Sequence, residues 1–255
     1  MLEVGCGTGF LSQRLLERFG PAARHRPLCF TDLAPEMVAA CQRRLDSLDS
    51  QQPGSQQPDS QQPDSQQPYQ FQILDGEALR SATTARLGLI ASSFALQWFN
   101  NPQTILEQWL QCLVPGGWLA LAFPTCHSFR QLRTQCQTLG LPDPILALPD
   151  PTPLIAHFHN RTRQCIFHQA FVPLEAPNAR AFLRHFHRIG AVPTAAGLGA
   201  NPAANPAANS AASSARSRSA PLSTGQLRRL IRCWDGTSPQ GITVDYHVTY
   251  LLLQR

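Results

Sequence analysis

The sequence predicts an α/β fold in which strands alternate with helices, and three observations support this. The chain opens with a short apolar run that leads into the motif EVGCGTG at residues 3–9. An amphipathic segment, Phe10 to Phe19, follows the glycines. Further apolar runs end in carboxylates or in glycine turns, and helix-like patterns separate them. Such alternation favours a mostly parallel sheet, because parallel strands need helical crossovers.

The glycine motif predicts a site for a nucleotide-like ligand. Three glycines between a strand and a helix let a ligand approach the backbone at the helix N-terminus. A nicotinamide fingerprint would need a glycine at position 10, but Phe10 stands there and Gly9 breaks the register. The spacing therefore disfavours a dehydrogenase. A plain strand-turn-helix remains the alternative, since a glycine-rich turn alone is weak evidence.

A second strand and helix follow. Pro27 to Thr31 is a short apolar strand candidate, and Asp32 comes directly after it, where doubly wound folds place a carboxylate on ribose hydroxyls. Pro35 is suited to a first helical position. The apolar period of the helix then runs through Met37, Val38, Cys41 and Leu45. The alternative role for Asp32 is an ordinary helix cap.

Three more strands are expected. Residues 71–77 form a strand candidate that ends in two carboxylates, Asp75 and Glu77. Leu87 to Ser93 is the fourth strand candidate, and the glycine turn at 115–117 leads into a fifth, Trp118 to Phe123. Together, the glycine motif, Asp32, the carboxylates after the third strand and the two later strands are much more specific for a nucleotide-like ligand site than the glycine motif alone.

Two low-complexity stretches interrupt the chain. Residues 50–68 repeat Ser-Gln-Gln-Pro with Gly or Asp, and residues 195–220 are rich in Ala, Asn, Pro and Ser. Neither can bury an apolar face, so both are expected to be disordered. Loop closure costs only about 0.6 kcal/mol for each doubling of length, so such insertions are tolerable. We therefore expect one domain over residues 1–255.

Membrane, disulfide and metal sites are not expected. No window approaches the roughly 18 apolar residues of a membrane span, and no signal peptide pattern is seen, so we expect a cytoplasmic protein. The eight cysteines contain no Cys-x-x-Cys pair. His157 with His159, and His185 with His187, are two apart in helix-like segments and should point to different faces.

Cys126 and His127 are neighbours in sequence, which suggests a nucleophile and its base. Sequence adjacency is not the spatial adjacency that catalysis needs, however. We assign no function to this pair on sequence grounds.

The positive charge is concentrated in one segment. The formal net charge is +5, and residues 177–235 hold eight arginines against a single carboxylate, Asp235. Two helix candidates lie here, one through Phe182 and Phe186, the other opened by Ser223 and Gln226 in capping-box spacing. Basic helices of this kind suit an acidic partner or an anionic substrate. The alternative is an ordinary solvated face, and nucleic acid is disfavoured because few aromatics accompany the arginines.

Four further segments narrow the assignment. They are ASSFALQW at 91–98, SFRQL at 128–132, LRHFHRIGA at 183–191 and DYHV at 245–248. Together with the glycine motif they resemble the malonyl-acyl carrier protein O-methyltransferases of biotin synthesis, which are class I S-adenosylmethionine methyltransferases. The chain departs from that family at His187, where a lysine is usual, and at Asp245, where a threonine is usual. The resemblance also leads us to expect a helical segment ahead of the glycine motif, where this sequence has only Met1 and Leu2.

The resemblance implies a Rossmann-like fold: a seven-stranded, mostly parallel sheet with helices on both faces. Antiparallel strands would run from Gln164 to Leu174 and from Ile242 to Gln254, with a basic helical lid insert, residues 177–235, between them. It also implies S-adenosylmethionine as cofactor. The methionine part would be held by Glu3, Gly5, Gly7 and Gly9, the ribose by Asp32, the adenine side by Met37, Asp75 and Glu77, and the floor by Ser92.

On the substrate side, the resemblance implies methylation of the free carboxylate of a malonyl thioester on acyl carrier protein or coenzyme A. Arg184 is the candidate partner of that carboxylate, because a planar guanidinium can donate two parallel hydrogen bonds to the two carboxylate oxygens. The pocket around the reacting carboxylate of the substrate would be lined by Gln97, Trp98 and Tyr246. No residue is assigned as a general acid or base.

Simpler structural roles stay open for these residues: Trp98 in the core, Tyr246 packed on the last strand, Arg184 on the surface. Two other functions also stay open. One is a class I methyltransferase for a small acid or a quinone-type ring, and the other is a non-catalytic remnant.

Overall fold

The computed structural model describes residues 1–20, 28–49, 69–82, 86–188 and 222–255. Its contacts divide the chain into two compact units. The first unit comprises residues 1–122, 155–166 and 251–255, and the second comprises residues 123–154 and 167–250. The low-complexity stretches 50–68 and 195–220 lie outside the described residues. One domain over the whole chain stays a prediction.

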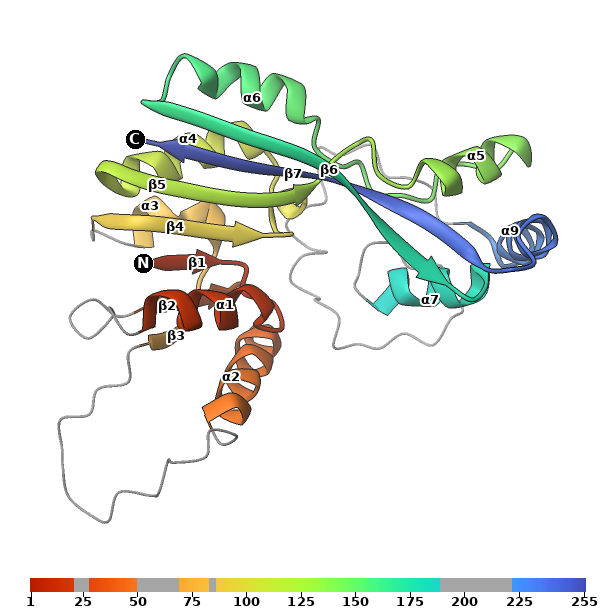
Figure 1. Cartoon of the computed structure of the whole chain (residues 1–255), viewed down its shortest axis with the longest axis horizontal. Helices are drawn as coiled ribbons and strands as arrows, with labels where there is room; N and C mark the ends of the chain where they lie inside the picture. The colour runs from red at the N-terminus through yellow and green to blue at the C-terminus, as the bar shows by residue number, and fades with distance from the viewer. Residues whose placement is uncertain (21–27, 50–68, 83–85, 189–221) are drawn as a thin grey trace, which may run out of the picture. The chain divides into compact units, whose positions relative to one another are not determined.

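Seven strands form one sheet in the order β3-β2-β1-β4-β5-β7-β6 (Figure 1). Pairing is parallel between β1 and β2, β2 and β3, β1 and β4, and β4 and β5. The amide of Arg255 donates to Gly117 O, and that of Thr125 donates to His247 O, so β7 runs antiparallel to β5. The expected seven-stranded, mostly parallel sheet is confirmed.

The first unit alternates strands and helices from the N-terminus. Its strands are β1 (Leu2–Val4), β2 (Leu28–Asp32), β3 (Tyr69–Ile73), β4 (Leu87–Ser93) and most of β5 (Leu113–Pro124). Its helices are α1 (Phe10–Phe19), α2 (Pro35–Asp49), α3 (Leu79–Ala82) and α4 (Pro102–Cys112), with short 3-10 helices at Gly76–Ala78 and Leu96–Trp98. α6 (Pro151–His159) begins in the second unit and ends in the first.

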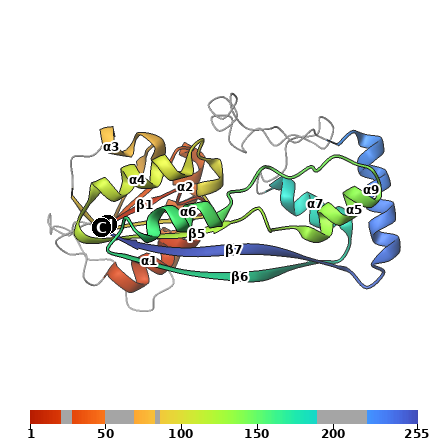
Figure 2. The same ribbon diagram turned by 90° about the horizontal axis from the view of Figure 1, so that it is seen from above.

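Helices cover both faces of this part of the sheet. The chain moves outward from β1 to β3 and then returns to β4 on the other side of β1. Right-handed crossovers on the two sides of that reversal place their helices on opposite faces. Figure 2 shows α1 on one face and α4 on the other. The carboxyl ends of β1 and β4 therefore flank the point where the strand order reverses, which is where open α/β sheets bind ligands.

Among the described residues, the second unit holds three whole helices that follow β5. They are α5 (Arg130–Thr138), α7 (Ala179–Arg188) and α9 (Thr224–Thr237), together with most of β6 (Gln164–Ala176) and β7 (Ile242–Gln254). The expected capping box is confirmed: Ser223 Oγ accepts from the amide of Gln226, whose side chain accepts from the amide of Ser223. α7 and α9 pack through Phe182 and Trp234, whose ring centroids are 5.5 Å apart. Along the chain, both helices follow β6 and precede β7, as expected of the insert.

Several expected strand boundaries were wrong. β2 ends at Asp32 and not at Thr31, and β6 ends at Ala176 and not at Leu174. Two others differ more. The third strand ends at Ile73 rather than at the carboxylates, because Asp75 accepts from the amide of Glu77 and caps a 3-10 helix. The fifth begins at Leu113, so the glycine turn lies inside a long strand. Gly116 takes a φ of +78° there, and the pairing with β4 shifts between Leu87 and Leu89. The glycines thus form a β-bulge within the strand and do not end it.

Each unit has its own apolar core. In the first unit the cluster includes Leu15, Leu28, Phe30 and Leu45 from α1, β2 and α2. In the second, it includes Phe129, Leu132, Phe182 and Trp234. All eight cysteines are free thiols. Within the described part of the chain, no helix is both long and apolar enough to span a bilayer.

Candidate active site

The glycine loop between β1 and α1 depends on backbone conformations that favour glycine. Gly5, Gly7 and Gly9 have φ values of +76°, +52° and +85°. A Cβ on Gly5 would lie 2.5 Å from the Cβ of Ala95, so this glycine allows close packing. A Cβ on Gly7 would meet nothing within 4 Å. The middle of the loop therefore faces open space, into which a ligand can fit against the backbone.

Glu3 has a buried carboxyl group, of which one oxygen accepts a hydrogen bond from a described residue and the other does not. Its side chain is on β1, and the residue is only 1% exposed. Oε2 accepts a 2.6 Å hydrogen bond from Ser12 Oγ, whereas Oε1 has no hydrogen-bond partner among the described residues. Burial raises the pKa of Glu3 from 4.5 to about 8, against the opposing effect of the Ser12 hydrogen bond. A cationic group beside Oε1 would restore the charged form.

Ser12 was missed by sequence reasoning. It is fully buried on α1, donates to Glu3, and lies 3.2 Å from the thiol of Cys41. The one signal in the sequence is a small hydroxyl residue three positions beyond Gly9, within the first turn of the helix. Helical pattern alone gives no reason to connect it with β1.

Asp32 ties the glycine loop to the second strand. It is the last residue of β2, and its Oδ2 accepts a 2.9 Å hydrogen bond from the amide of Gly7. Its Oδ1 accepts from the amide of Ala34 at 3.0 Å, just before α2. Asp32 thus accepts hydrogen bonds both from the glycine loop and from the segment at the start of α2. Met37, half-buried, lies one turn further along α2.

The two carboxylates after β3 have structural partners. Asp75 is exposed and caps the 3-10 helix. Glu77 Oε1 accepts from the amide of Asn100 at 2.8 Å and from its side-chain amide at 3.2 Å. Trp109 Nε1 donates to Gly76 O between them. These bonds connect the segment after β3 to Asn100, just before α4, and to Trp109 within α4.

The end of β4 lies beside the glycine loop. Ser92 is buried, and its Oγ donates to Val4 O at 2.7 Å. Gln97 is buried as well and donates from Nε2 to Phe94 O at 2.6 Å. Trp98 is 38% exposed, so the core does not cover it. Phe94, which sequence reasoning missed, has a φ of +54° and is exposed, and strained backbone of this kind is typical of functional sites.

Arg184 and Tyr246 belong to the second unit. Arg184 is exposed on α7. Tyr246 is half-buried on β7, with its ring edge against Phe129 at a centroid distance of 4.6 Å. Burial raises the pKa of Tyr246 to about 12, so it is a neutral hydrogen-bonding group at physiological pH. The nine expected cofactor residues, Gln97 and Trp98 all belong to the first unit, whereas Arg184 and Tyr246 belong to the second.

The residues of the first unit fit the expected cofactor. A buried carboxyl oxygen without a partner suits the ammonium of an amino-acid moiety, and the space over Gly7 leaves the backbone accessible. Asp32 stands at the end of the neighbouring strand, where carboxylates meet ribose hydroxyls. These residues can bind and orient the cofactor, and no acid-base chemistry is required of them.

Comparison with known proteins agrees with this geometry. Residues 2–119 match the family model described as a methyltransferase domain. The malonyl-[acyl-carrier protein] O-methyltransferase of Magnetococcus marinus is 26% identical over 98% of this chain and 76% of its own length. The biotin biosynthesis bifunctional protein BioCD of Bordetella avium is 27% identical over 98% of this chain, which spans 42% of that longer protein.

A solved structure shares the fold. The YcgJ protein of Bacillus subtilis superposes with a TM-score of 0.57 at 11% identity, covering 100% of this chain and 90% of the other. At that identity the likeness concerns the fold and no more.

Proposed function

We propose that this chain, which belongs to the class I S-adenosylmethionine-dependent methyltransferases, methylates the free carboxylate of a malonyl thioester on acyl carrier protein. One observation carries the choice of substrate. The methyltransferase family model ends at residue 119, but similarity to the Magnetococcus malonyl-[acyl-carrier protein] O-methyltransferase extends over 98% of the chain. That similarity therefore includes the helical insert of the second unit.

The chemistry needs alignment more than proton transfer. A carboxylate titrates near pH 4 (about 3.9 to 4.3 for side-chain carboxyls), so at neutral pH it is already a nucleophile. S-adenosylmethionine supplies an electrophilic methyl group on a positively charged sulfur. The carboxylate oxygen forms the new O–CH3 bond as the S–CH3 bond breaks, and the thioether leaves neutral. The protein then contributes by holding oxygen, carbon and sulfur in line.

The cofactor roles follow from the first unit. Glu3 would face the ammonium of the methionine part, with the loop at Gly5, Gly7 and Gly9 beside it. Asp32 would hold the ribose while its bond to Gly7 keeps the loop in place. We assign the adenine side to Met37, Asp75 and Glu77, and the floor at the end of β4 to Ser92.

On the substrate side, Arg184 would pair with the malonyl carboxylate. Gln97, Trp98 and Tyr246 would surround the reacting end. The insert also presents exposed arginines at positions 180, 184, 228, 229 and 232, and none of these takes part in the ion pairs found among the described residues. A basic surface on α7 and α9 suits an acidic carrier protein, which it would attract by electrostatic steering.

Methylation would change how the malonyl end is recognised. The ester carries no charge, so it resembles an apolar chain end and can be elongated by enzymes that act on such chains. This role places the reaction early in the synthesis of the pimelate part of biotin. The proposal for the pathway rests on the resemblance and on the similarity to the Bordetella BioCD protein.

Two other functions predict different behaviour. A class I methyltransferase for a small acid or quinone-type ring would use the same first unit but would have no need of the basic insert. A non-catalytic remnant would bind the cofactor or a partner without turnover.

The deciding experiment is the intact mass of malonyl-acyl carrier protein after incubation with the chain and S-adenosylmethionine. The expected result is a gain of one methylene, which is absent when the carrier holds an acetyl thioester. Parallel reactions with malonyl-coenzyme A compare the two thioesters. Binding of S-adenosylhomocysteine without any gain in mass on either thioester would contradict the proposal and favour one of the other functions.

A further inference from the structure

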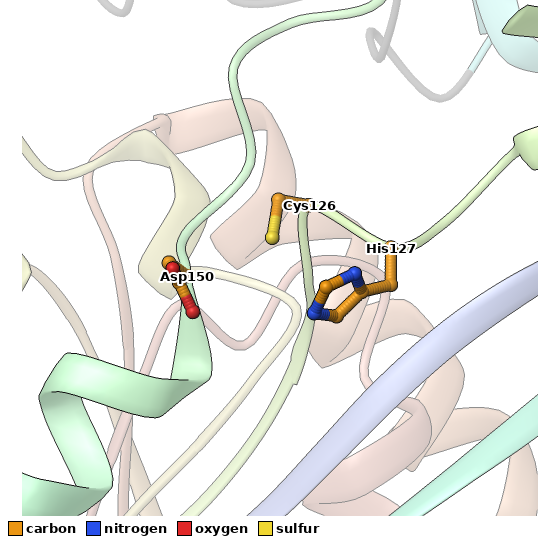
Figure 3. A group of neighbouring side chains, drawn as sticks. All are labelled: Cys126, His127 and Asp150. Atoms are coloured by element: carbon orange, nitrogen blue, oxygen red, sulfur yellow. The ribbon is translucent and has the colours of Figure 1, made fainter.

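Three potential metal ligands meet in the second unit. Cys126 and His127 follow the end of β5, and Asp150 precedes α6. One ligand atom from each side chain lies within 4.8 Å of the others. Figure 3 shows the three side chains directed toward a common space. Cys126 is half-buried, while His127 and Asp150 are exposed and accessible to an ion from solvent.

Backbone hydrogen bonds bring the two segments together. The amide of Cys126 donates to Pro149 O at 3.0 Å, which fixes the start of α6 beside the thiol. Asp150 Oδ1 accepts from the amide of Thr152 at 2.9 Å. This bond orients the carboxylate and engages one of its two oxygens, so the other can serve a ligand site.

The loop that carries Cys126 and His127 is held from two further directions. Arg133 donates to the carbonyl oxygens of Cys126 and Ser128, both at 2.6 Å, and forms a 2.9 Å ion pair with Asp143. The ring of His127 stands edge-on to that of His247, with centroids 5.2 Å apart. Supports of this kind hold the backbone of the loop in place, so that only side-chain torsions remain to be ordered when an ion binds.

The donor set favours zinc over the hard cations. Thiolate and imidazole are borderline or soft ligands that Zn²⁺ accepts together with a carboxylate, whereas Mg²⁺ and Ca²⁺ prefer oxygen alone. At zinc-ligand distances of about 2.0–2.3 Å, tetrahedral donors lie about 3.5 Å apart. The observed limit of 4.8 Å is close enough for rotation of the two exposed side chains to complete the site.

We propose that Cys126, His127 and Asp150 bind one Zn²⁺ ion, with water in the fourth position. Binding would release the thiol proton to solvent and leave a thiolate on the metal. Sequence analysis predicted no metal site here, because Asp150 stands far from the Cys-His pair along the chain. Bound zinc would crosslink the end of β5 to the start of α6, so it should also stabilise the folded protein.

Cobalt provides a direct test on the full-length chain. Co²⁺ bound through a thiolate gives a sulfur-to-metal charge-transfer band, and competition by Zn²⁺ then measures the affinity for zinc. We expect one equivalent of Co²⁺ with this band in the unmodified chain. The variants C126S, H127N and D150N should each weaken zinc binding at least about tenfold, and C126S should also lose the band.

Matched controls separate this site from adventitious binding. C165S removes a half-buried cysteine outside the proposed site, and H159N removes an exposed histidine outside it, on α6. Both should keep the band and the affinity. Circular dichroism checks that every variant is folded. Absence of saturable Zn²⁺ binding by the unmodified chain, or retention of the band and affinity in C126S, would overturn the proposal.

Discussion

The amide of Gly7 donates a 2.9 Å hydrogen bond to Oδ2 of Asp32. The carboxylate at the end of β2 therefore holds the glycine loop that follows β1, in addition to its place at the expected ribose position. Because Oδ1 of the same carboxylate accepts from Ala34, one side chain connects the loop, β2 and the start of α2.

This arrangement predicts the effect of Asp32→Asn. An amide can keep only one of the two acceptor atoms, and its NH2 group would face the donor of Gly7. Since hydrogen bonds to charged groups contribute about 1.5–3 kcal/mol, affinity for S-adenosylhomocysteine should fall about tenfold or more. Isothermal titration calorimetry measures this. Glu36→Gln, an exposed carboxylate of α2, is the control and should bind normally; equal affinities in both variants would contradict the role.

Glu3 should make the stability of the ligand-free protein depend on pH. Burial raises its pKa from 4.5 to about 8, so the folded state holds the proton more tightly than the unfolded state. Its contribution to stability is complete below pH 4.5 and is lost as the pH rises through about 8. Urea unfolding of the wild type and Glu3→Gln across this range should show the difference between them change with pH. A constant difference would argue against the buried, protonated carboxyl.

Two glycines of the loop should respond differently to alanine. Both have positive φ, so each substitution carries a backbone cost of about 1–2 kcal/mol. Gly5→Ala adds a clash with Ala95 and should lose a further 1–3 kcal/mol or so of unfolding free energy. Gly7→Ala meets open space and should instead weaken cofactor binding. Denaturant unfolding and calorimetry on both variants test the pair, and the reverse order of stabilities would contradict it.

Arg184→Ala tests the substrate role. If this arginine pairs with the malonyl carboxylate, KM for malonyl-acyl carrier protein should rise about tenfold while affinity for the cofactor stays near wild type. Arg163→Ala, an exposed arginine of the first unit outside this basic surface, is the control and should change KM much less. Equal losses of substrate and cofactor binding would indicate a structural effect instead.

The arginines of α9 should act through long-range attraction. Replacement by glutamine at 228, 229 and 232 should lower kcat/KM for malonyl-acyl carrier protein and flatten its dependence on salt. The control carries the same charge change on exposed arginines of the first unit, at 43, 86 and 163. If both triple variants respond alike to salt, the effect comes from net charge and not from a docking surface on α9.

The order of the elements and the kind of cofactor site could be predicted from local patterns in the amino-acid sequence. The strand at Leu87–Ser93 has the bounds expected from its apolar pattern. The capping box at Ser223 was also correct. Each of these depends on neighbouring residues: apolar periodicity, a cap three residues from its partner, or glycines at fixed spacing. Local signals of this kind need no knowledge of the rest of the chain.

The contacts between residues that are far apart in sequence could not be predicted in this way, because they depend on how the chain folds. The tertiary structure buried Glu3 against Ser12, bonded Gly7 to Asp32, and brought Asp150 to Cys126 and His127. It also kept the glycines at 115–117 within β5, because pairing with β4 and β7 outweighed their preference for a turn. Burial, pKa and ligand geometry follow from which elements pack together, and that packing is a property of the whole fold and not of any single segment.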